Sequence, residues 1–388
     1  MTKTLTFKVI MCLLVPLLLS GCLGGGTEIN DLEIVVGMGV DKDKDTGKIL
    51  LTAQIVREGE IGSNSGNGGG QNAKAFWNVT ATGDTIFDAI REMTHKTGNR
   101  LFVSHNHVVI YGYNIAEEGL QEHIDFFLRS HEMRPTAFIL IAECDVSAVL
   151  DAKPETEELP AMNIAKLLKS HGYTSHFIEV NLKDFISCLM SPTTSPVAPI
   201  VEVTPGEESE DIYISGMAIF KKDKMVGKLN KEETRGLLWV KGKIKSGVLL
   251  VPSPGKQGKI ALEILEAKTK VTPKMENGKI VMDVNIKVDT SLAEQATIEN
   301  MATLPGFEKM QKIQEEVIKH EIMAAFEKSK ELKADIFGFG EMLHKKYSSK
   351  WNAIKDNWDD IYPDIVLNID VKAEIKKADL LVKAPAPG

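Results

Sequence analysis

The segments 260-IALEILEAKTKV-271 and 279-KIVMDVNIKVD-289 decide the fold class of the last third of this chain. Apolar and polar residues alternate in both, as expected for an antiparallel strand pair with one buried and one exposed face. A stripe of apolar residues at helical spacing follows: Phe307, Met310, Ile313 and Val317. We expect a helix of residues 307–332, about 39 Å long at about 1.5 Å per residue, which is enough to cross a whole sheet.

Hairpins and helices in mixed order are also expected in the rest of the chain. The predicted hairpins comprise residues 34–40 with 49–56 and residues 212–220 with 225–229. Further strands are expected at residues 76–82, 101–111, 136–142, 247–251 and 365–371. Helices are expected after Asp84 and Asn114, at residues 159–170, 182–190 and 231–239, and around Met342 and Asn352. Because no βαβ unit repeats, the pattern predicts an α+β fold with mostly antiparallel sheets.

Proline-rich segments divide the chain. A length of 388 residues is more than one hydrophobic core usually serves. Residues 191–210 contain four prolines, and Pro252-Ser-Pro-Gly255 interrupts the chain again. These breaks predict three domains in series: an N-terminal α+β domain (22–200), a middle domain (205–255) and a C-terminal α+β domain with the long helix (256–388).

The first 22 residues have the pattern of a lipoprotein signal peptide. Lys3 and Lys8 precede an apolar run that is too short to cross a bilayer, and Leu19-Ser20-Gly21-Cys22 follows at once. We expect residues 1–21 to be removed and Cys22 to carry a diacylglyceryl group and an N-acyl chain. Chains of this kind anchor a protein durably to a membrane.

Charge and cysteine content narrow the possible functions. The net charge is −8, and loss of Lys3 and Lys8 would lower it to −10, so nucleic-acid binding is not expected. An acidic body also has no general attraction to anionic lipids, so membrane attachment must come from Cys22 and from protein partners. Cys144 and Cys188 would remain after cleavage, either as a disulfide or as buried free thiols.

Residues with catalytic or metal-binding potential are few. Asp41, Asp43 and Asp45 resemble the start of a calcium loop, but the glycine and glutamate that such a loop needs are missing, which favours a hairpin turn. His105 and His107 share one face of the predicted strand 101–111, yet no third metal ligand can be named, which favours a structural role. Because hydrolase, nucleotide-binding and zinc motifs are absent from the sequence, we expect no enzyme, no metal and no cofactor.

Several blocks together resemble the Ger(x)C family of spore germination lipoproteins. The similar segments, in chain order, are 28–41, Asn99-Arg100 with Ser104-His105, 126–134, 215–220 with 226–229 and 233–236, Asp335-Ile336-Phe337-Gly338-Phe339-Gly340, and Trp351 with Trp358. The resemblance spans nearly the whole chain. It implies a three-domain, non-catalytic C subunit of a nutrient germinant receptor, attached by Cys22 to the outer face of the spore inner membrane.

The resemblance also implies partners. Such a subunit lies beside two integral membrane subunits, one of them permease-like, that sense nutrients and trigger ion and dipicolinate release; whether the C subunit contacts a nutrient stays open. Arg129, Arg134 and Arg235 are candidate partner contacts, with intramolecular ion pairs as the alternative. Residues 337–340 could be a functional corner, but a backbone turn whose aromatic rings pack against the long helix is the simpler interpretation.

Two other classes of protein fit the sequence less well. A solute-binding lipoprotein of a transporter would show two lobes of βαβ alternation around a cleft, whereas this sequence predicts hairpins. A cell-wall hydrolase would need a catalytic carboxylate pair or a metal triad, which the residues do not provide.

Overall fold

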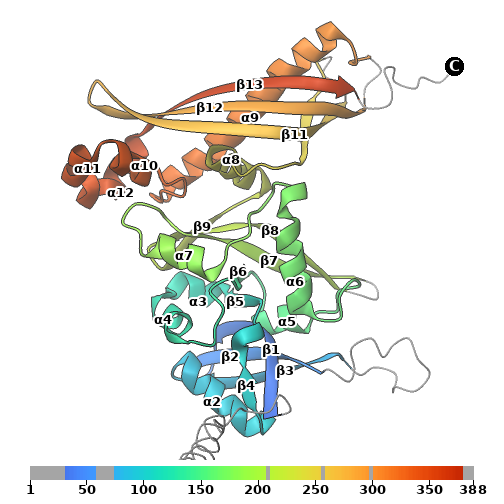
Figure 1. The fold of residues 1–388 in the computed structure, drawn as a ribbon, viewed down its shortest axis with the longest axis vertical. Coiled ribbons are helices and arrows are strands. Elements are labelled where there is room, and N and C mark those ends of the chain that lie inside the picture. Colours follow the sequence, from blue (N-terminus) through green and yellow to red (C-terminus); the bar gives the residue numbers. More distant parts are fainter. Residues whose placement is uncertain (1–30, 58–73, 207–209, 255–257, 297–299, 379–388) are drawn as a thin grey trace, which may run out of the picture.

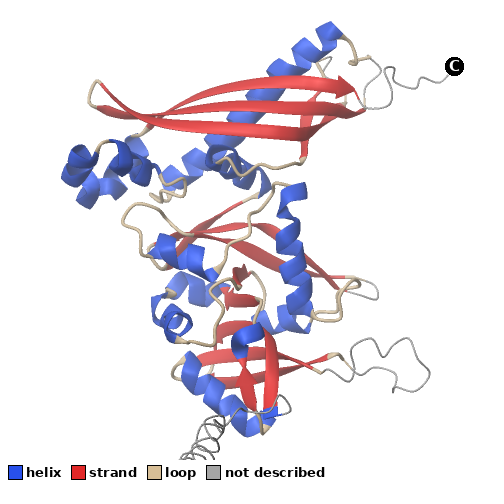
Figure 2. Ribbon diagram, in the orientation of Figure 1, coloured by secondary structure: helices blue, strands red, loops and turns tan. Residues whose placement is uncertain are grey.

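The computed structural model describes residues 31–57, 74–206, 210–254, 258–296 and 300–378. These residues form two β-sheets that follow one another along the long axis of the molecule, with helices packed on both (Figures 1 and 2). Strand β1 lies near one end of that axis and β13 near the other (Figure 1). The predicted α+β class is confirmed. Among the described residues, no helix is both long enough and sufficiently apolar to span a bilayer.

The first sheet has nine strands, in the order β3-β2-β1-β5-β6-β7-β8-β9, with β4 paired to β1. Its strands are β1 (Leu32–Lys42), β2 (Ile49–Val56), β3 (Phe76–Gly83), β4 (Arg100–Phe102), β5 (Val108–Gly112), β6 (Phe138–Ala142), β7 (Val197–Pro205), β8 (Glu210–Lys221) and β9 (Lys224–Leu229). Both predicted hairpins are confirmed, since β1 pairs antiparallel with β2 and β8 with β9. The turn between β1 and β2 closes through Asp43, whose carboxylate accepts hydrogen bonds from the amide and hydroxyl of Thr46 at 2.8 and 2.6 Å.

The centre of this sheet is parallel, which the sequence analysis did not predict. Strand β5 pairs parallel with β1, β6 with β5, and β7 with β6. Parallel neighbours need crossover connections. Helices supply them: α2 (Ile86–Thr97), α3 (Tyr113–Glu118), α4 (Gln121–Arg129), α5 (Val146–Asp151), α6 (Pro160–Lys169) and α7 (Leu182–Leu189). Helix α2 is capped by Thr85, whose hydroxyl accepts the amide of Asp88, and not by Asp84 as expected.

The strand predicted at residues 101–111 is wrong as a single element. It is divided into β4, a 3-10 turn at Val103–His105, and β5, and both strands pair parallel with β1. The amide of Asn106 closes the turn on the carbonyl oxygen of Val103 at 3.0 Å. His105 therefore lies in a turn, so that His105 and His107 do not share a strand face.

The boundary predicted between residues 200 and 205 falls inside β7. This strand pairs with β8 along its whole length and with β6 at Ile141–Ile200 and Ala142–Val201. The predicted middle domain (205–255) is therefore not a separate sheet, because β8 and β9 extend the first one. Prolines in residues 191–210 suggested a linker, but Pro199 is tolerated within a strand that is paired over only two residues on its β6 side.

The second sheet has four strands, in the order β10-β11-β12-β13. Its strands are β10 (Val248–Pro252), β11 (Lys259–Glu276), β12 (Lys279–Gln295) and β13 (Val366–Ala378). The predicted hairpin is confirmed as β11 and β12, and β13 adds to it in parallel. Helix α9 (Leu304–Glu331) crosses the sheet (Figure 1). Its 28 residues make it about 42 Å long, and Ile318, Ile322 and Phe326 are buried on its inner face.

The chain then turns sharply at residues 335–340 before the short helices α10 (Phe339–Lys346), α11 (Ser348–Ile354) and α12 (Trp358–Ile361). The buried carboxylate of Asp335 accepts hydrogen bonds from the amides of Gly338, Phe339 and Gly340 at 2.8, 2.9 and 2.7 Å. Phe337 and Phe339 stack on each other at 5.0 Å between ring centroids, and each lies about 6 Å from Phe326 of α9. The packed turn that we expected here is confirmed.

The Asp335 turn predicts a pH dependence of stability. Burial raises the pKa of Asp335 from 3.8 to about 6, although the three amide hydrogen bonds oppose the shift. Between these values the folded chain keeps a proton that the unfolded chain has lost, so this contribution to stability is present below about pH 4 and disappears as the pH rises through about 6. We expect the free energy of unfolding in urea to fall over this window by up to about 3 kcal/mol more in the wild type than in Asp335→Asn. Parallel pH profiles of the two proteins would contradict this.

Candidate functional site

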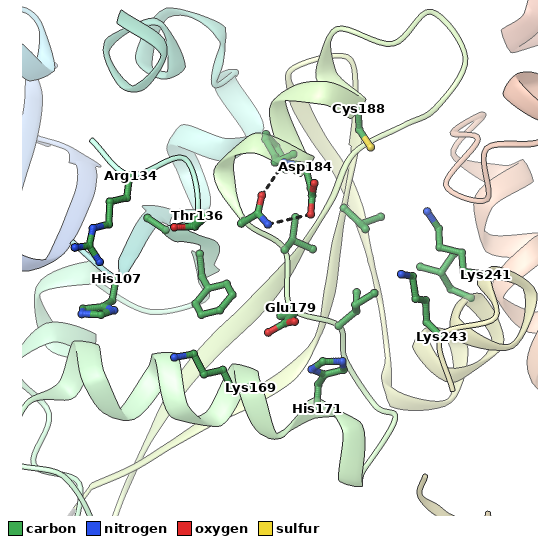
Figure 3. A pocket seen from close by; sticks show the side chains of 18 of the residues that line it. His107, Arg134, Thr136, Lys169, His171, Glu179, Asp184, Cys188, Lys241 and Lys243 are labelled. Atoms are coloured by element: carbon green, nitrogen blue, oxygen red, sulfur yellow. Dashed lines mark hydrogen bonds between the residues drawn. The ribbon is translucent and has the colours of Figure 1, made fainter. Parts of the chain in front are cut away.

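A polar cavity of about 630 Å³ lies between the helices of the first sheet and the end of α8 (Lys231–Lys241) (Figure 3). Several separate parts of the chain line it. His107 and Arg134 flank β5 and β6, Lys169 ends α6, Asp184 begins α7, and Lys241 ends α8. No single motif contains these residues, which is why the sequence analysis did not find the cavity.

Positive charge predominates in the cavity. Five lysine and arginine side chains line it: Arg134, Lys169, Lys241, Lys243 and Lys245. The acidic lining residues are Glu179 and Asp184, and Asp184 accepts a hydrogen bond from the side-chain amide of Asn181 at 3.0 Å. With the histidines neutral, the lining has a net charge of +3, whereas the whole chain has −8.

The pKa shifts of individual groups agree with this excess of positive charge. Burial, and then the charges of Lys169 and Arg134, lower the pKa of His107. Burial also lowers the pKa of Lys241, and the neighbouring Lys243 adds to the effect. Nδ1 of His171 donates a hydrogen bond to the carbonyl oxygen of Leu168 at 3.1 Å. The cavity can therefore offer several hydrogen-bond donors and positive charge to a ligand.

A second polar feature joins the two sheets. Helix α8 begins with a capping box, in which Asn230 and Glu233 exchange side-chain to backbone hydrogen bonds of 2.9 and 2.8 Å. It then crosses α9 at very short range. A Cβ atom on Gly236 would lie 2.0 Å from the carbonyl oxygen of Glu321, so only glycine allows this crossing.

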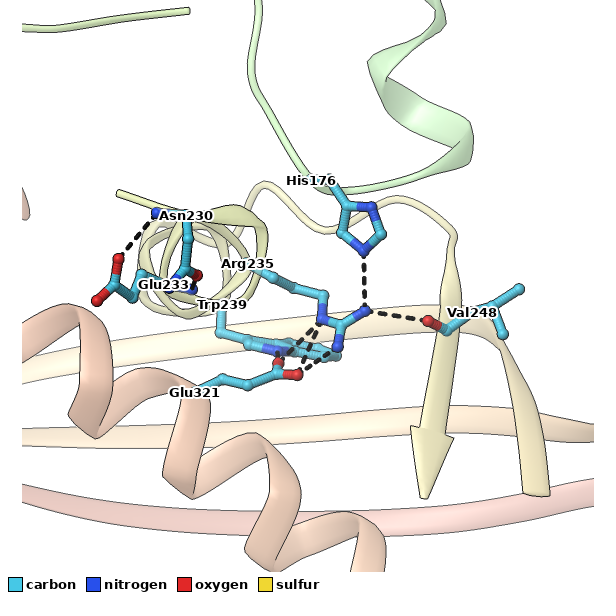
Figure 4. A network of polar contacts seen from close by, with 7 residues as sticks. All are labelled: His176, Asn230, Glu233, Arg235, Trp239, Val248 and Glu321. Atoms are coloured by element: carbon cyan, nitrogen blue, oxygen red, sulfur yellow. Dashed lines mark hydrogen bonds and ion pairs between the residues drawn. The ribbon is translucent and has the colours of Figure 1, made fainter. Parts of the chain in front are cut away.

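Arg235 and Glu321 form a buried ion pair at the crossing (Figure 4). Their side chains are 7% and 4% exposed. The Nε of Arg235 donates to both carboxylate oxygens at 3.1 and 3.0 Å, and the indole of Trp239 donates to one of them at 2.9 Å. Nη1 of Arg235 reaches His176 at 3.2 Å and the carbonyl oxygen of Val248 at 3.0 Å. One guanidinium of α8 thus contacts α9, β10 and the segment after α6.

The candidate residues from the sequence fall in different places. For Arg235 the structure has the intramolecular ion pair, which was the alternative to a partner contact, and this pair buries the side chain. Arg129 is on the surface, with a side chain that is 80% exposed and paired to Asp125 at 2.7 Å. Arg134 is exposed and lines the cavity. Cys22 lies outside the described residues.

The remaining candidates have structural surroundings. His105 packs its ring 5.6 Å from that of Phe102, while His107 lines the cavity. Within the described ranges, no group of three or more histidine, cysteine or acidic side chains could hold a metal ion. Cys144 and Cys188 are free thiols, so there is no disulfide between them. Cys144 is exposed, not buried as expected, because it follows the end of β6.

The ion pair at the crossing gives a stability prediction. Glu321→Ala leaves the Arg235 guanidinium buried without its counter-charge, which typically costs about 3–5 kcal/mol. We expect the double variant Arg235→Met/Glu321→Leu to recover much of that loss, since no charge is then buried. Urea unfolding of the wild type, Glu321→Ala and the double variant measures both effects. A loss below about 1 kcal/mol in Glu321→Ala would show that the pair does not stabilise the junction.

The comparisons with known proteins agree over both halves of the chain. Residues 25–203 match the family described as "Spore germination protein N-terminal domain", and residues 215–378 match "Spore germination B3/ GerAC like, C-terminal". The "Putative spore germination protein YfkR" of Bacillus subtilis (strain 168) is 26% identical over 388 residues, covering 99% of each chain. "Spore germination protein KC" of the same organism is 26% identical over 383 residues, covering 94% of this chain and 93% of its own.

A solved structure is similar in fold. The crystal structure of the GerBC protein superposes with a TM-score of 0.58 at 20% sequence identity, covering 88% of this chain and 97% of that one. The two family matches and the relatives cover the segments, from residues 28–41 to Trp351 and Trp358, whose sequence resembles the Ger(x)C family. The chain belongs to the Ger(x)C family of spore germination proteins.

Proposed function

We propose that this protein is the non-catalytic, lipid-anchored C subunit of a nutrient germinant receptor in the spore inner membrane. The observation that supports it most is the match of both halves of the chain to spore germination families, combined with a lipoprotein signal that ends at Cys22. Its partners would be two integral membrane subunits, one of them permease-like. The subunit itself would need no metal or cofactor.

The position of Cys22 limits how the body can lie on the membrane. Asp31 follows Cys22 by nine positions, and an extended chain spans at most about 3.3–3.6 Å per residue, or about 30 Å in total. Since β1 lies near one end of the long axis, that end would face the outer leaflet and β13 would point away from it (Figure 1). Anchoring raises the effective concentration of the subunit beside its membrane partners.

Helix α4, which ends at Arg129, lies in the half of the molecule that contains β1 (Figure 1). Next to this arginine are the exposed apolar side chains Leu128 and Phe87, with 56% and 52% exposure. Arg129, Phe87 and Phe126 line a shallow groove of about 370 Å³. Arginine and aromatic residues are enriched in protein interfaces, and this groove would face the membrane side. We assign it as the docking surface for an extracytoplasmic loop of a membrane subunit.

Deleting the gene in its native host tests the receptor role. The gene is deleted in a strain that already lacks the sister receptors. Compared with their parent, the resulting spores should lose nutrient-triggered dipicolinate release but respond normally to a non-nutrient trigger. Restoring the wild-type gene should restore the response. Restoring Cys22→Ala should leave the body folded and weaken both membrane retention and the response. A normal nutrient response in the deletion strain would contradict the receptor role, and growth defects on one solute would favour a transport protein.

Charge reversal tests the docking surface. Arg129→Glu together with Leu128→Asp should reduce co-purification of the membrane subunits at least about tenfold, because both changes oppose an apolar, anion-pairing contact. Lys345→Glu is the matched control. Lys345 is similarly exposed at 73% and also pairs at i,i+4 spacing, with Glu341, but it lies in α10 next to the second sheet. Equal co-purification of the two variants would contradict this surface.

A further inference from the structure

We propose that the cavity between α6, α7 and the end of α8 binds a small organic anion with two acidic groups, of the dicarboxylate class. This site is separate from the docking surface and does not depend on the receptor role. It rests on the charges that line the cavity, their arrangement, one buried polar side chain and the size of the space.

Within the described ranges, the cations of the cavity make no ion pair with an acidic side chain. Elsewhere on the molecule, lysine and arginine side chains commonly pair with carboxylates, as Lys166 does with Glu157 at 2.7 Å on the same helix as Lys169. Over the described residues, none of the five cavity cations makes an ion pair or a side-chain hydrogen bond: Arg134, Lys169, Lys241, Lys243 and Lys245. The five cations outnumber the two carboxylates of the lining, so a bound anion would relieve the repulsion among them.

The cations lie in two groups. Figure 3 shows Arg134 on one side of the cavity beside His107, with Lys169 below them, and Lys241 and Lys243 on the opposite side. The shifts in pKa agree with this division, because Lys169 and Arg134 act on His107 while Lys243 acts on Lys241. Glu179 lies between the groups (Figure 3). A ligand with an acidic group at each end and an uncharged middle matches this order.

Asn106 is an independent indication of a polar ligand. Its side chain is 1% exposed, and the residue lines the cavity. In the part of the chain that the structure describes, neither its amide nitrogen nor its amide oxygen has a hydrogen-bond partner. An unsatisfied buried amide typically costs about 1–3 kcal/mol, and proteins retain such a group where it has a use. The amide can donate to a carboxylate that Lys169 and Arg134 attract.

The space also suits a small molecule. A volume of about 630 Å³ lies within the usual range of about 300–1,000 Å³ for ligand sites. Apolar side chains form part of the wall, among them Phe138, Phe185 and Leu237. The guanidinium of Arg134 matches the planar geometry of a carboxylate, and lysines on the far side offer a point charge to the second acidic group.

Calorimetric titration of the purified full-length chain in detergent tests this assignment. The probes are succinate, glutarate and citrate, with the uncharged glutaramide as the ligand control. We expect saturable binding of at least one of the acids, with a dissociation constant below about 1 mM, weakening with added salt, and no binding of glutaramide. Absence of saturable binding by all three acids up to 10 mM would overturn the proposal.

Two variants locate the binding. Lys169→Gln should weaken it about tenfold, whereas the matched control Lys166→Gln, on the same helix but outside the cavity, should leave it unchanged. Asn106→Leu should weaken binding while the free protein stays as stable as the wild type or becomes more stable, because the buried amide has no partner to lose. Equal loss of affinity in the two lysine variants, or full affinity in both Lys169→Gln and Asn106→Leu, would overturn the assignment.

Discussion

The buried ion pair between Arg235 and Glu321 determines how the two sheets are joined. Burying two charges is favourable only when every remaining donor and acceptor is satisfied, and here Trp239, His176 and the carbonyl of Val248 complete the network. The guanidinium can reach all of them only because Gly236 lets α8 touch the backbone of α9. This geometry holds α8 against α9.

The position of α8 in turn forms the cavity. Its last residue, Lys241, lies at the junction between α7 of the first sheet and the turn at Asp335, whose charge interacts with that of Lys241. The amide of Ser195 also donates to the backbone oxygen of Asp335 at 2.9 Å, which connects the start of β7 to the same turn. Lysines that follow α8 therefore face residues of α6 and of the segment between β4 and β5. The packing of these helices and turns against one another brings the cations of the cavity together.

Much of the fold could be predicted because its patterns are local. Alternation in residues 260–289, helical spacing in 307–332 and turn residues in 41–47 each depend on neighbours within a few positions. The parallel centre of the first sheet could not be predicted in this way. Strands β5 and β6 are buried continuously, so they show no alternation, and their partners lie far away in sequence. Strand β7 was missed because its prolines resemble a linker.

The sequence by itself determined the family, the α+β class, the long helix and the expected lipid site at Cys22, since each of these can be recognised from motifs of residues that lie close together in the sequence. Tertiary structure alone decided that Arg235 is buried while Arg129 is exposed, although both are arginines on amphipathic helices. It also decided that Arg134, Lys169 and Lys241 share one cavity. Burial and electrostatic environment depend on which elements, far apart in the sequence, pack together. A local pattern of residues does not determine this packing.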